Sequence, residues 1–224
     1  LHKDYQDPDA LRKLAASIKD HTLHHLDEYL AKAEQALVSR GANVHFASTG
    51  EDAKQMILDI LRSHGVTRLT KSKSMAAEEI HLNPFLIENG IECLESDLGE
   101  FIIQLDDDIP SHIVKPIIHK NRREIARTFQ REGIAKDYND DPETITRRAR
   151  VFLREKYMKA EAGITGANFV CADSGRMLLV TNEGNSRFGM APVPVHIALV
   201  GIEKIIPREK DLSVFLNLLG RAAT

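Results

Sequence analysis

The alternation of short apolar runs with helical patterns is the feature that most constrains the fold of this chain. The runs "NVHFA", "VTRLT" and "IECLE" have the length and residue types of strands, and helical patterns separate them. Strands that alternate with helices form a mainly parallel sheet with helices on both faces, which is an α/β fold. The functional loops of such a sheet follow the carboxyl ends of its strands, so we expect a site there.

The N-terminal segment has a helical pattern of its own. Apolar residues recur at helical spacing from Leu11 to Leu37, and Gly41 supplies a stop. We therefore predict one long helix within residues 1–41, packed on a single α/β domain in residues 42–224.

Further helix signals lie inside that domain. Ser48 and Glu51 have the spacing of a capping box, and Asn83 with Pro84 has the pattern of an N-cap and first turn. Residues 121–162 are highly charged, with apolar residues at intervals, which predicts a helical insertion with an exposed break at "KDYNDDPET". We interpret the break as a loop, because no Ser/Gly linker or internal repeat marks a domain boundary.

Composition excludes several classes of function. The formal net charge of −3 and the pI near 6.4 argue against nucleic acid as a partner, and every apolar run is shorter than the roughly 20 residues of a membrane span. We expect a cytoplasmic protein. Cys93 and Cys171 are isolated, and His21 with His25 lacks the further ligands of a zinc site, so we expect no metal and no cofactor in this chain. The first residue is Leu, which suggests a piece of a longer chain.

The stretch "GITGANFVCADSGRMLLVTNEGNSR" combines two apolar runs with unusually polar loops. The runs "NFVCA" and "RMLLVT" flank "DSG", which predicts a β-hairpin with Gly175 at positive φ. Glycine lets the backbone approach a ligand and point N–H groups at it, whereas the alternative is that these residues only form turns. The candidate ligand-binding residues of the two loops are Gly163, Thr165, Gly166, Asn168, Asn182, Gly184 and Asn185.

A second candidate lies in "TKSKSM", which follows the strand "VTRL" and precedes a helix. Lys71 and Lys73 would meet an anion there, with Ser72 and Ser74 as hydroxyl donors. A small carboxylate or a phosphate would suit the site. The alternative is a solvated basic loop in which Ser caps the helix.

These motifs carry a resemblance that runs over nearly the whole chain. "GITGANFVCADSG", "TNEGN", "PVHIALVGIEKIIP", "KSKSM" and "DLGEFIIQL" resemble the lactate-utilization (LUD) domain family and, more narrowly, the N-terminal half of the lactate utilization protein B family. The resemblance implies a fold similar to the ribose-phosphate isomerase and CoA-transferase superfamily, and a role in oxidising L-lactate to pyruvate with other lactate-utilization proteins. It also implies [4Fe–4S] clusters in a C-terminal cysteine-rich region, which these residues lack.

Acidic residues complete the candidate site. Asp173 and Glu183 are the catalytic candidates, since the resemblance implies an acidic nucleophile or base near such a turn, although an Asp before Ser-Gly is also an ordinary turn residue. Of Glu78 and Glu79, we expect one to face the site and the other to face water. His112 and His119 are weak candidates, and His196 is predicted to be a satisfied histidine at a sheet edge.

We expect the lysine loop and both glycine loops to border one cleft that contains at least one of the acids. Three hypotheses for the function remain open. The domain takes part directly in lactate oxidation through this cleft, or it is a scaffold that docks partners, or it retains the isomerase or acyl-transfer chemistry of the superfamily.

Overall fold

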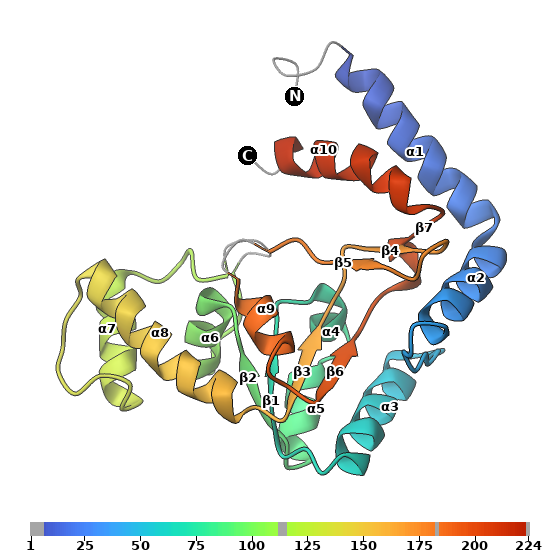
Figure 1. Cartoon of the computed structure of the whole chain (residues 1–224). Coiled ribbons are helices and arrows are strands. Elements are labelled where there is room, and N and C mark those ends of the chain that lie inside the picture. The colour runs from blue at the N-terminus through green and yellow to red at the C-terminus, as the bar shows by residue number, and fades with distance from the viewer. Residues whose placement is uncertain (1–6, 112–115, 182–183, 223–224) are drawn as a thin grey trace. The chain divides into compact units, whose positions relative to one another are not determined.

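The computed structural model describes residues 7–111, 116–181 and 184–222 and shows an α/β protein (Figure 1). The chain forms two compact units. The large unit comprises residues 47–166 and 181–199, and the small unit comprises residues 1–46, 167–180 and 200–224. Each unit is therefore assembled from segments that are far apart in the sequence.

A four-stranded parallel sheet forms the centre of the large unit, in the order β2-β1-β3-β6. This arrangement confirms the predicted α/β fold. The strands are β1 (Arg68–Lys71), β2 (Glu92–Glu95), β3 (Ala162–Thr165) and β6 (Val195–Ala198). The prediction of a strand at "NVHFA" was wrong. Residues 43–47 have no regular structure, and Phe46 is half exposed, so the alternating pattern has no neighbouring strand or core to stabilise it.

Helices cover the sheet and extend the large unit beyond it. Their bounds are α3 (Gly50–Ser63), α4 (Met75–Glu79), α5 (Leu82–Glu88), α6 (Leu98–Leu105), α7 (Arg122–Arg131), α8 (Pro142–Lys159) and α9 (Asn185–Met190). Side chains alternate between the faces of a strand, so Leu69 and Cys93 share one face with their neighbour Ile164. The buried side chains of α3 and α5, such as Leu61 and Leu86, pack into the same core.

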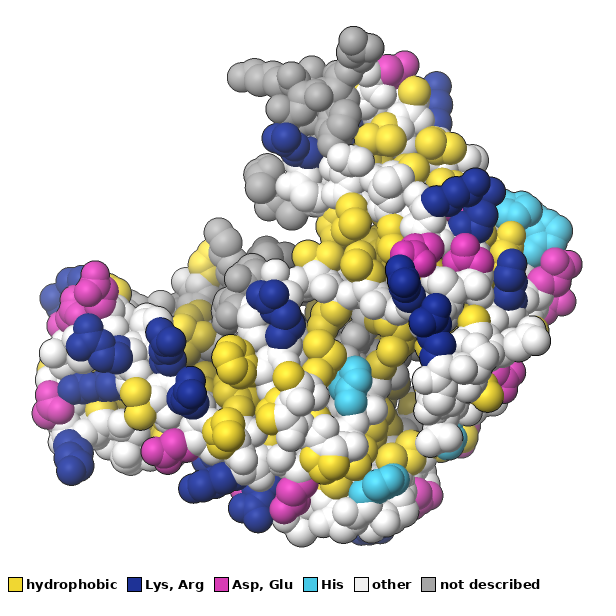
Figure 2. Space-filling view, in the orientation of Figure 1, with side chains coloured by type: hydrophobic (Ala, Val, Ile, Leu, Met, Phe, Trp, Pro, Cys, Tyr) yellow, Lys and Arg dark blue, Asp and Glu magenta, His cyan; other side chains and the backbone are white. Residues whose placement is uncertain are grey.

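The helical insertion is confirmed. Helices α7 and α8 flank the expected break, and they pack with α6 into a second core that contains Phe101, Phe129 and Leu153. Outside this core, Lys and Arg side chains are numerous over α7 and α8 (Figure 2).

Two of the predicted helix starts were displaced. Thr49 rather than Ser48 caps α3, because the Thr49 hydroxyl accepts from the backbone of Asp52 and the Asp52 carboxylate accepts from Thr49. Helix α5 begins after His81, not at Asn83. The Asn83 side chain does not cap a helix; instead it donates to a glutamate at the end of β2, described below.

The small unit has its own sheet, in the order β5-β4-β7. Its elements are α1 (Pro8–His24), α2 (Leu26–Val38), β4 (Phe169–Cys171), β5 (Met177–Leu178), the 3₁₀ helix η1 (Ile202–Lys204), β7 (Ile205–Ile206), the 3₁₀ helix η2 (Glu209–Asp211) and α10 (Leu212–Ala222). The antiparallel β4–β5 hairpin is confirmed, with Gly175 at φ +63°. The predicted N-terminal helix is interrupted at His25, whose ψ of 35° is not helical.

No helix in the described part of the chain is both long enough and apolar enough to cross a lipid bilayer.

Candidate functional site

A buried ion-pair cluster lies at the carboxyl ends of β1 and β2. Lys71 ends β1 and Glu95 ends β2, and the two residues are register partners on adjacent parallel strands, so their side chains project from the same face. The Lys71 Nζ lies 2.9 Å from Oε1 of Glu95 and 3.0 Å from Oε1 of Glu78, which comes from α4. The Lys71 side chain is completely buried, which is rare for lysine unless it is paired.

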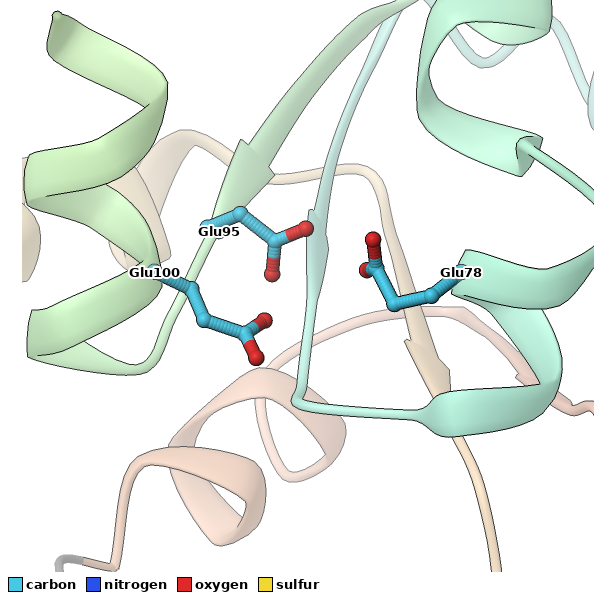
Figure 3. Close-up of side chains that lie close together, drawn as sticks. All are labelled: Glu78, Glu95 and Glu100. Atoms are coloured by element: carbon cyan, nitrogen blue, oxygen red, sulfur yellow. The ribbon is translucent and has the colours of Figure 1, made fainter. Parts of the chain in front are cut away.

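A third carboxylate, from Glu100 on α6, completes what we call the Lys71 cluster: Lys71, Glu78, Glu95 and Glu100. Figure 3 shows the three carboxylates directed toward a common space from α4, β2 and α6. Their oxygens include one set within 4.8 Å of one another. The exposed fraction of the side chain is 5% for Glu95, 10% for Glu100 and 42% for Glu78, so the cluster reaches solvent at Glu78.

Local hydrogen bonds hold the carboxylates in place. The Asp97 side chain accepts from the backbone of Gly99 and Glu100, so it caps α6 and fixes Glu100 in the first turn. The Asn83 side chain donates to Oε1 of Glu95, and Oε1 of Gln104 accepts from the Glu95 backbone at 3.0 Å. The side chain of Glu95 is therefore held by a residue of α5 and its backbone by a residue of α6.

Burial and neighbouring charges shift the protonation of the cluster. Burial, and then the adjacent Glu95 carboxylate, raise the pKa of Glu100 to about 8, although Lys71 opposes the shift. Burial acts to lower the pKa of Lys71, but its two carboxylate partners outweigh this effect and hold the pKa above its ordinary value. At neutral pH Lys71 is thus charged, while Glu100 keeps its proton.

The lysine loop differs from the prediction. We expected Lys71 to meet an anion in a loop after the strand, but it is the last residue of β1 and is buried, because the carboxylates of Glu95 and Glu78 compensate its charge inside the protein. Lys73 is 29% exposed, and its Nζ lies 3.9 Å from Oε1 of Glu100. Ser72 and Ser74 are buried. The Ser74 hydroxyl accepts from the backbone of Ala77, so the alternative reading of a serine cap is confirmed for Ser74.

The lysine loop and parts of both glycine loops lie at the same edge of the sheet. The Ser72 backbone donates to the carbonyl of Ile164 at 2.8 Å, and a Cβ added to Gly166 would lie 3.2 Å from the Ser74 hydroxyl. From the second loop, the Asn185 amide donates to the carbonyl of Ser96 at 3.2 Å, and the Ser96 backbone in turn donates to the carbonyl of Lys71 at 2.9 Å. This geometry agrees with the expected proximity of the loops within the large unit.

Other candidates have local structural partners. Gly163 packs closely against α9, since an added Cβ would lie only 2.1 Å from the Gly189 carbonyl oxygen. The Thr165 hydroxyl bonds the ring of His196 at 2.9 Å, which confirms His196 as a satisfied histidine on the edge strand β6. Gly184, at φ +77°, precedes α9. Contact of these residues with a ligand remains a prediction.

The two predicted catalytic acids have different outcomes. Asp173 belongs to the small unit, where it is exposed and its Oδ1 accepts from the Glu209 backbone at 2.9 Å. Asn168, in the same unit, accepts from the backbone of Val180 across the hairpin. Glu183 lies outside the described residues, with Asn182. His112 lies outside them also. A catalytic role for either acid stays a prediction.

The structure identifies two residues that the sequence analysis missed, Glu95 and Glu100. Their signal was available: a carboxylate ends the strand "IECLE", and another follows the cap in "DLGE". The expectation for the adjacent pair is confirmed, because Glu78 joins the cluster and Glu79 is exposed. A cavity of about 40 Å³, lined in part by Arg68 and Glu92, lies at the amino ends of β1 and β2, away from the cluster.

Comparison with known proteins gives one consistent result. The family model described as the LUD domain matches residues 30–224. The chain is 45% identical over 212 residues to lactate utilization protein B 2 of Bacillus mycoides (strain KBAB4), and 44% identical over 212 residues to lactate utilization protein B of Bacillus cereus (strain AH820). Each alignment covers 95% of this chain but 45% of the relative, so the chain spans less than half the length of the relatives it matches. A search of solved structures found no match.

Proposed function

Because the chain belongs to the LUD domain family, we propose that it acts in lactate utilization, as the LUD domain of a protein that helps oxidise L-lactate to pyruvate. The observation that carries this proposal is the 45% identity, over 95% of the chain, to a protein named lactate utilization protein B 2. Other lactate-utilization proteins are the proposed partners, in the cytoplasm.

The proposed reaction requires an electron acceptor, because converting L-lactate to pyruvate releases two electrons and two protons. Iron–sulfur clusters are the proposed acceptors, but the residues of this chain do not fit them. A [4Fe–4S] cluster is held by four cysteine thiolates, whereas Cys93 and Cys171 are both buried and lie in different units. We therefore assign the clusters to a region outside these 224 residues and derive no step through them.

The Lys71 cluster supports a direct role for this domain. Perturbed pKa values concentrate at functional sites, and Glu100 combines such a shift, caused by burial, with charged neighbours. The cluster occupies the carboxyl edge of a parallel sheet, where α/β proteins bind ligands. Lys73, partly exposed beside it, is the proposed contact for the carboxylate of a small hydroxy or keto acid.

A genetic test decides whether the domain serves lactate utilization. Deletion of its coding sequence from the host should abolish growth on L-lactate while growth on glucose is normal, and return of the sequence should restore growth. Undiminished growth on L-lactate after deletion would refute the proposal.

A docking scaffold is the second candidate, favoured by the absence of an evident redox group among the side chains of the described residues. The complementation experiment distinguishes it when the returned gene carries Glu100→Gln, with Glu79→Gln as the exposed control. Loss of growth with normal protein level for Glu100→Gln alone supports a direct role. Full growth of both variants supports the scaffold. Residual isomerase or acyl-transfer chemistry would instead show as stabilisation by acyl-CoA rather than by lactate or pyruvate, by about 2.7 kcal/mol at 100 times the dissociation constant.

A further inference from the structure

We propose that Glu95 and Glu100 share one proton between buried oxygens, and that this carboxyl pair, positioned by Lys71, is the acid–base centre of the domain. The proposal deepens the proposed function, since it assigns residues to the proton that a hydroxy acid must give up. The claim that the pair holds a proton does not depend on the proposed function, because it rests on the geometry of the cluster.

The first observation is that two buried acceptors lack a donor. Oε2 of Glu95 and Oε2 of Glu100 are inaccessible to solvent, and neither has a hydrogen-bond partner in the described part of the chain. The Lys71 ammonium does not serve them, because its ion pairs are to Oε1 of Glu95 and Oε1 of Glu78. Buried polar oxygens are nearly always satisfied, so each of these two calls for a hydrogen atom or a cation, and the carboxylates are close enough, with oxygens within 4.8 Å of one another, for one proton to serve both.

The second observation is the charge of the surroundings. The ionisable groups that face Glu100 are Lys71 at the end of β1, Lys73 in the following loop, Glu78 on α4 and Glu95 on β2. Three carboxylates and two ammonium groups leave one net negative charge if every group is ionised. A single proton makes the cluster neutral, whereas a divalent cation would leave one net positive charge. Because an uncompensated buried charge is costly, the charge balance favours the proton.

The third observation is that the carboxyl pair is buried but lies next to partly exposed residues. Glu100 is 10% exposed and lies beside the partly exposed Lys73, while Glu78 opens the other side of the cluster. A small molecule bound at Lys73 would therefore meet the carboxyl pair at its outer rim. The raised pKa of Glu100, about 8, supports this role because an acid–base group works best near the ambient pH.

Lys71 is a positioning residue in this scheme. It holds Oε1 of Glu95 and leaves Oε2 directed to the shared proton. When the pair has lost its proton, a carboxylate oxygen accepts the hydroxyl proton of the substrate, and the protonated pair later returns it to water. The carbonyl of the product forms as the α C–H bond of the substrate breaks. The two electrons of that bond pass one at a time to the separate iron–sulfur acceptor, and its hydrogen leaves to water as the second proton.

Infrared difference spectroscopy on the whole 224-residue chain tests the proposal without lactate. We expect the C=O band of one protonated carboxyl at pH 6.5, lost as the pH rises through about 8. Glu100→Gln should remove the band and Glu79→Gln, an exposed glutamate on the same helix as Glu78, should leave it. If Glu100→Gln does not fold, Glu95→Gln should shift the band or its midpoint in a folded protein. A parent chain with no such band at pH 6.5, or a band unmoved by Glu100→Gln and Glu95→Gln, overturns the proposal.

A titration with Mn²⁺ tests whether a divalent cation, rather than a proton, lies between the carboxylates. We expect no stoichiometric binding to the metal-free chain, whereas one Mn²⁺ per chain, lost in Glu100→Gln, would replace the proton by a metal. The two proposals fail separately. A protonated carboxyl in a domain whose deletion leaves growth on L-lactate intact would refute the lactate function alone.

Discussion

Replacement of Lys71 by Met should destabilise the protein severely. The Lys71 side chain is completely buried and is the ion-pair partner of both Glu95 and Glu78, at 2.9 and 3.0 Å. Met fills a similar volume, so the effect isolates the lost charge. Removing one partner of a buried ion pair costs about 3–5 kcal/mol, because the remaining charge stays buried and unpaired. Against a total stability of about 5–15 kcal/mol, such a loss brings the domain close to unfolding.

Lys73→Met is the matched control for this change. It removes the same chemical group two residues away, but Lys73 is 29% exposed and its distance to Glu100 is 3.9 Å. Because Glu100 holds its proton at neutral pH and Lys73 is partly exposed, the loss for Lys73→Met should stay under about 1 kcal/mol. Urea denaturation followed by circular dichroism gives both free energies of unfolding. Equal losses for the two variants, or a loss under about 1 kcal/mol for Lys71→Met, would refute the assignment of Lys71 as a buried ion pair.

A second substitution tests the cause of the destabilisation. In Lys71→Met combined with Glu95→Gln, one of the stranded carboxylates becomes neutral. The double variant should be more stable than the sum of the single effects predicts, by at least about 1 kcal/mol, since the two side chains are in contact. Strict additivity would show that steric effects, rather than unpaired charge, destabilise the Lys71→Met variant.

Three further predictions concern other parts of the chain. Glu100 keeps its proton up to pH about 8 in the folded protein but only up to about pH 4.5 in the unfolded chain, so the free energy of unfolding should fall as the pH rises between these values. Denaturation at pH 5 and pH 7.5 measures this fall, which should be smaller in Glu100→Gln than in the parent chain by up to about 1.4 kcal/mol per pH unit. Gly163→Ala, whose Cβ would overlap the Gly189 carbonyl, should cost about 1–3 kcal/mol in thermal unfolding, whereas Gly220→Ala on α10, with open space, should cost nothing. The purified chain should contain less than about 0.1 iron atom per chain by metal analysis. A reproducible iron–sulfur absorbance would contradict our assignment of the clusters to a region outside these 224 residues.

Local patterns predicted those parts of the fold that local forces determine. The break between α7 and α8 was readable because "KDYNDDPET" disfavours both helix and burial, and the hairpin because Gly175 meets the need for positive φ. The strand expected at residues 43–47 failed for a non-local reason. Alternation of side chains stabilises a strand only when a neighbouring strand pairs with it, and none of the described residues does so there.

Residue type was misleading at the candidate site. Lysine is almost always exposed, so "KSKS" predicts a loop that either binds an anion or is solvated, and only the assembled fold shows carboxylates from α4, β2 and α6 around Lys71. At Gly163 the fold supplies a structural reason for glycine that the sequence pattern did not show. The missing Cβ permits close packing of α9 on β3, while contact of Gly163 with a ligand stays a prediction.

The Lys71–Glu95 pair was nevertheless within reach of a topological argument. Strands joined by a helical connection usually lie side by side in a parallel sheet, with their carboxyl ends at the same edge. "VTRLTK" and "IECLE" are two such strands, and each ends on a charged residue, of opposite sign. Adjacent strands in register would bring the two charges together on one face, which is the arrangement observed. Glu100 is not predictable in this way, because its approach to the pair depends on α6 folding back along β2, where Oε1 of Gln104 accepts from the backbone of Glu95. The Lys71–Glu95 ion pair is thus encoded in two neighbouring strands, whereas the proton that we assign to the site depends on a helix that follows them.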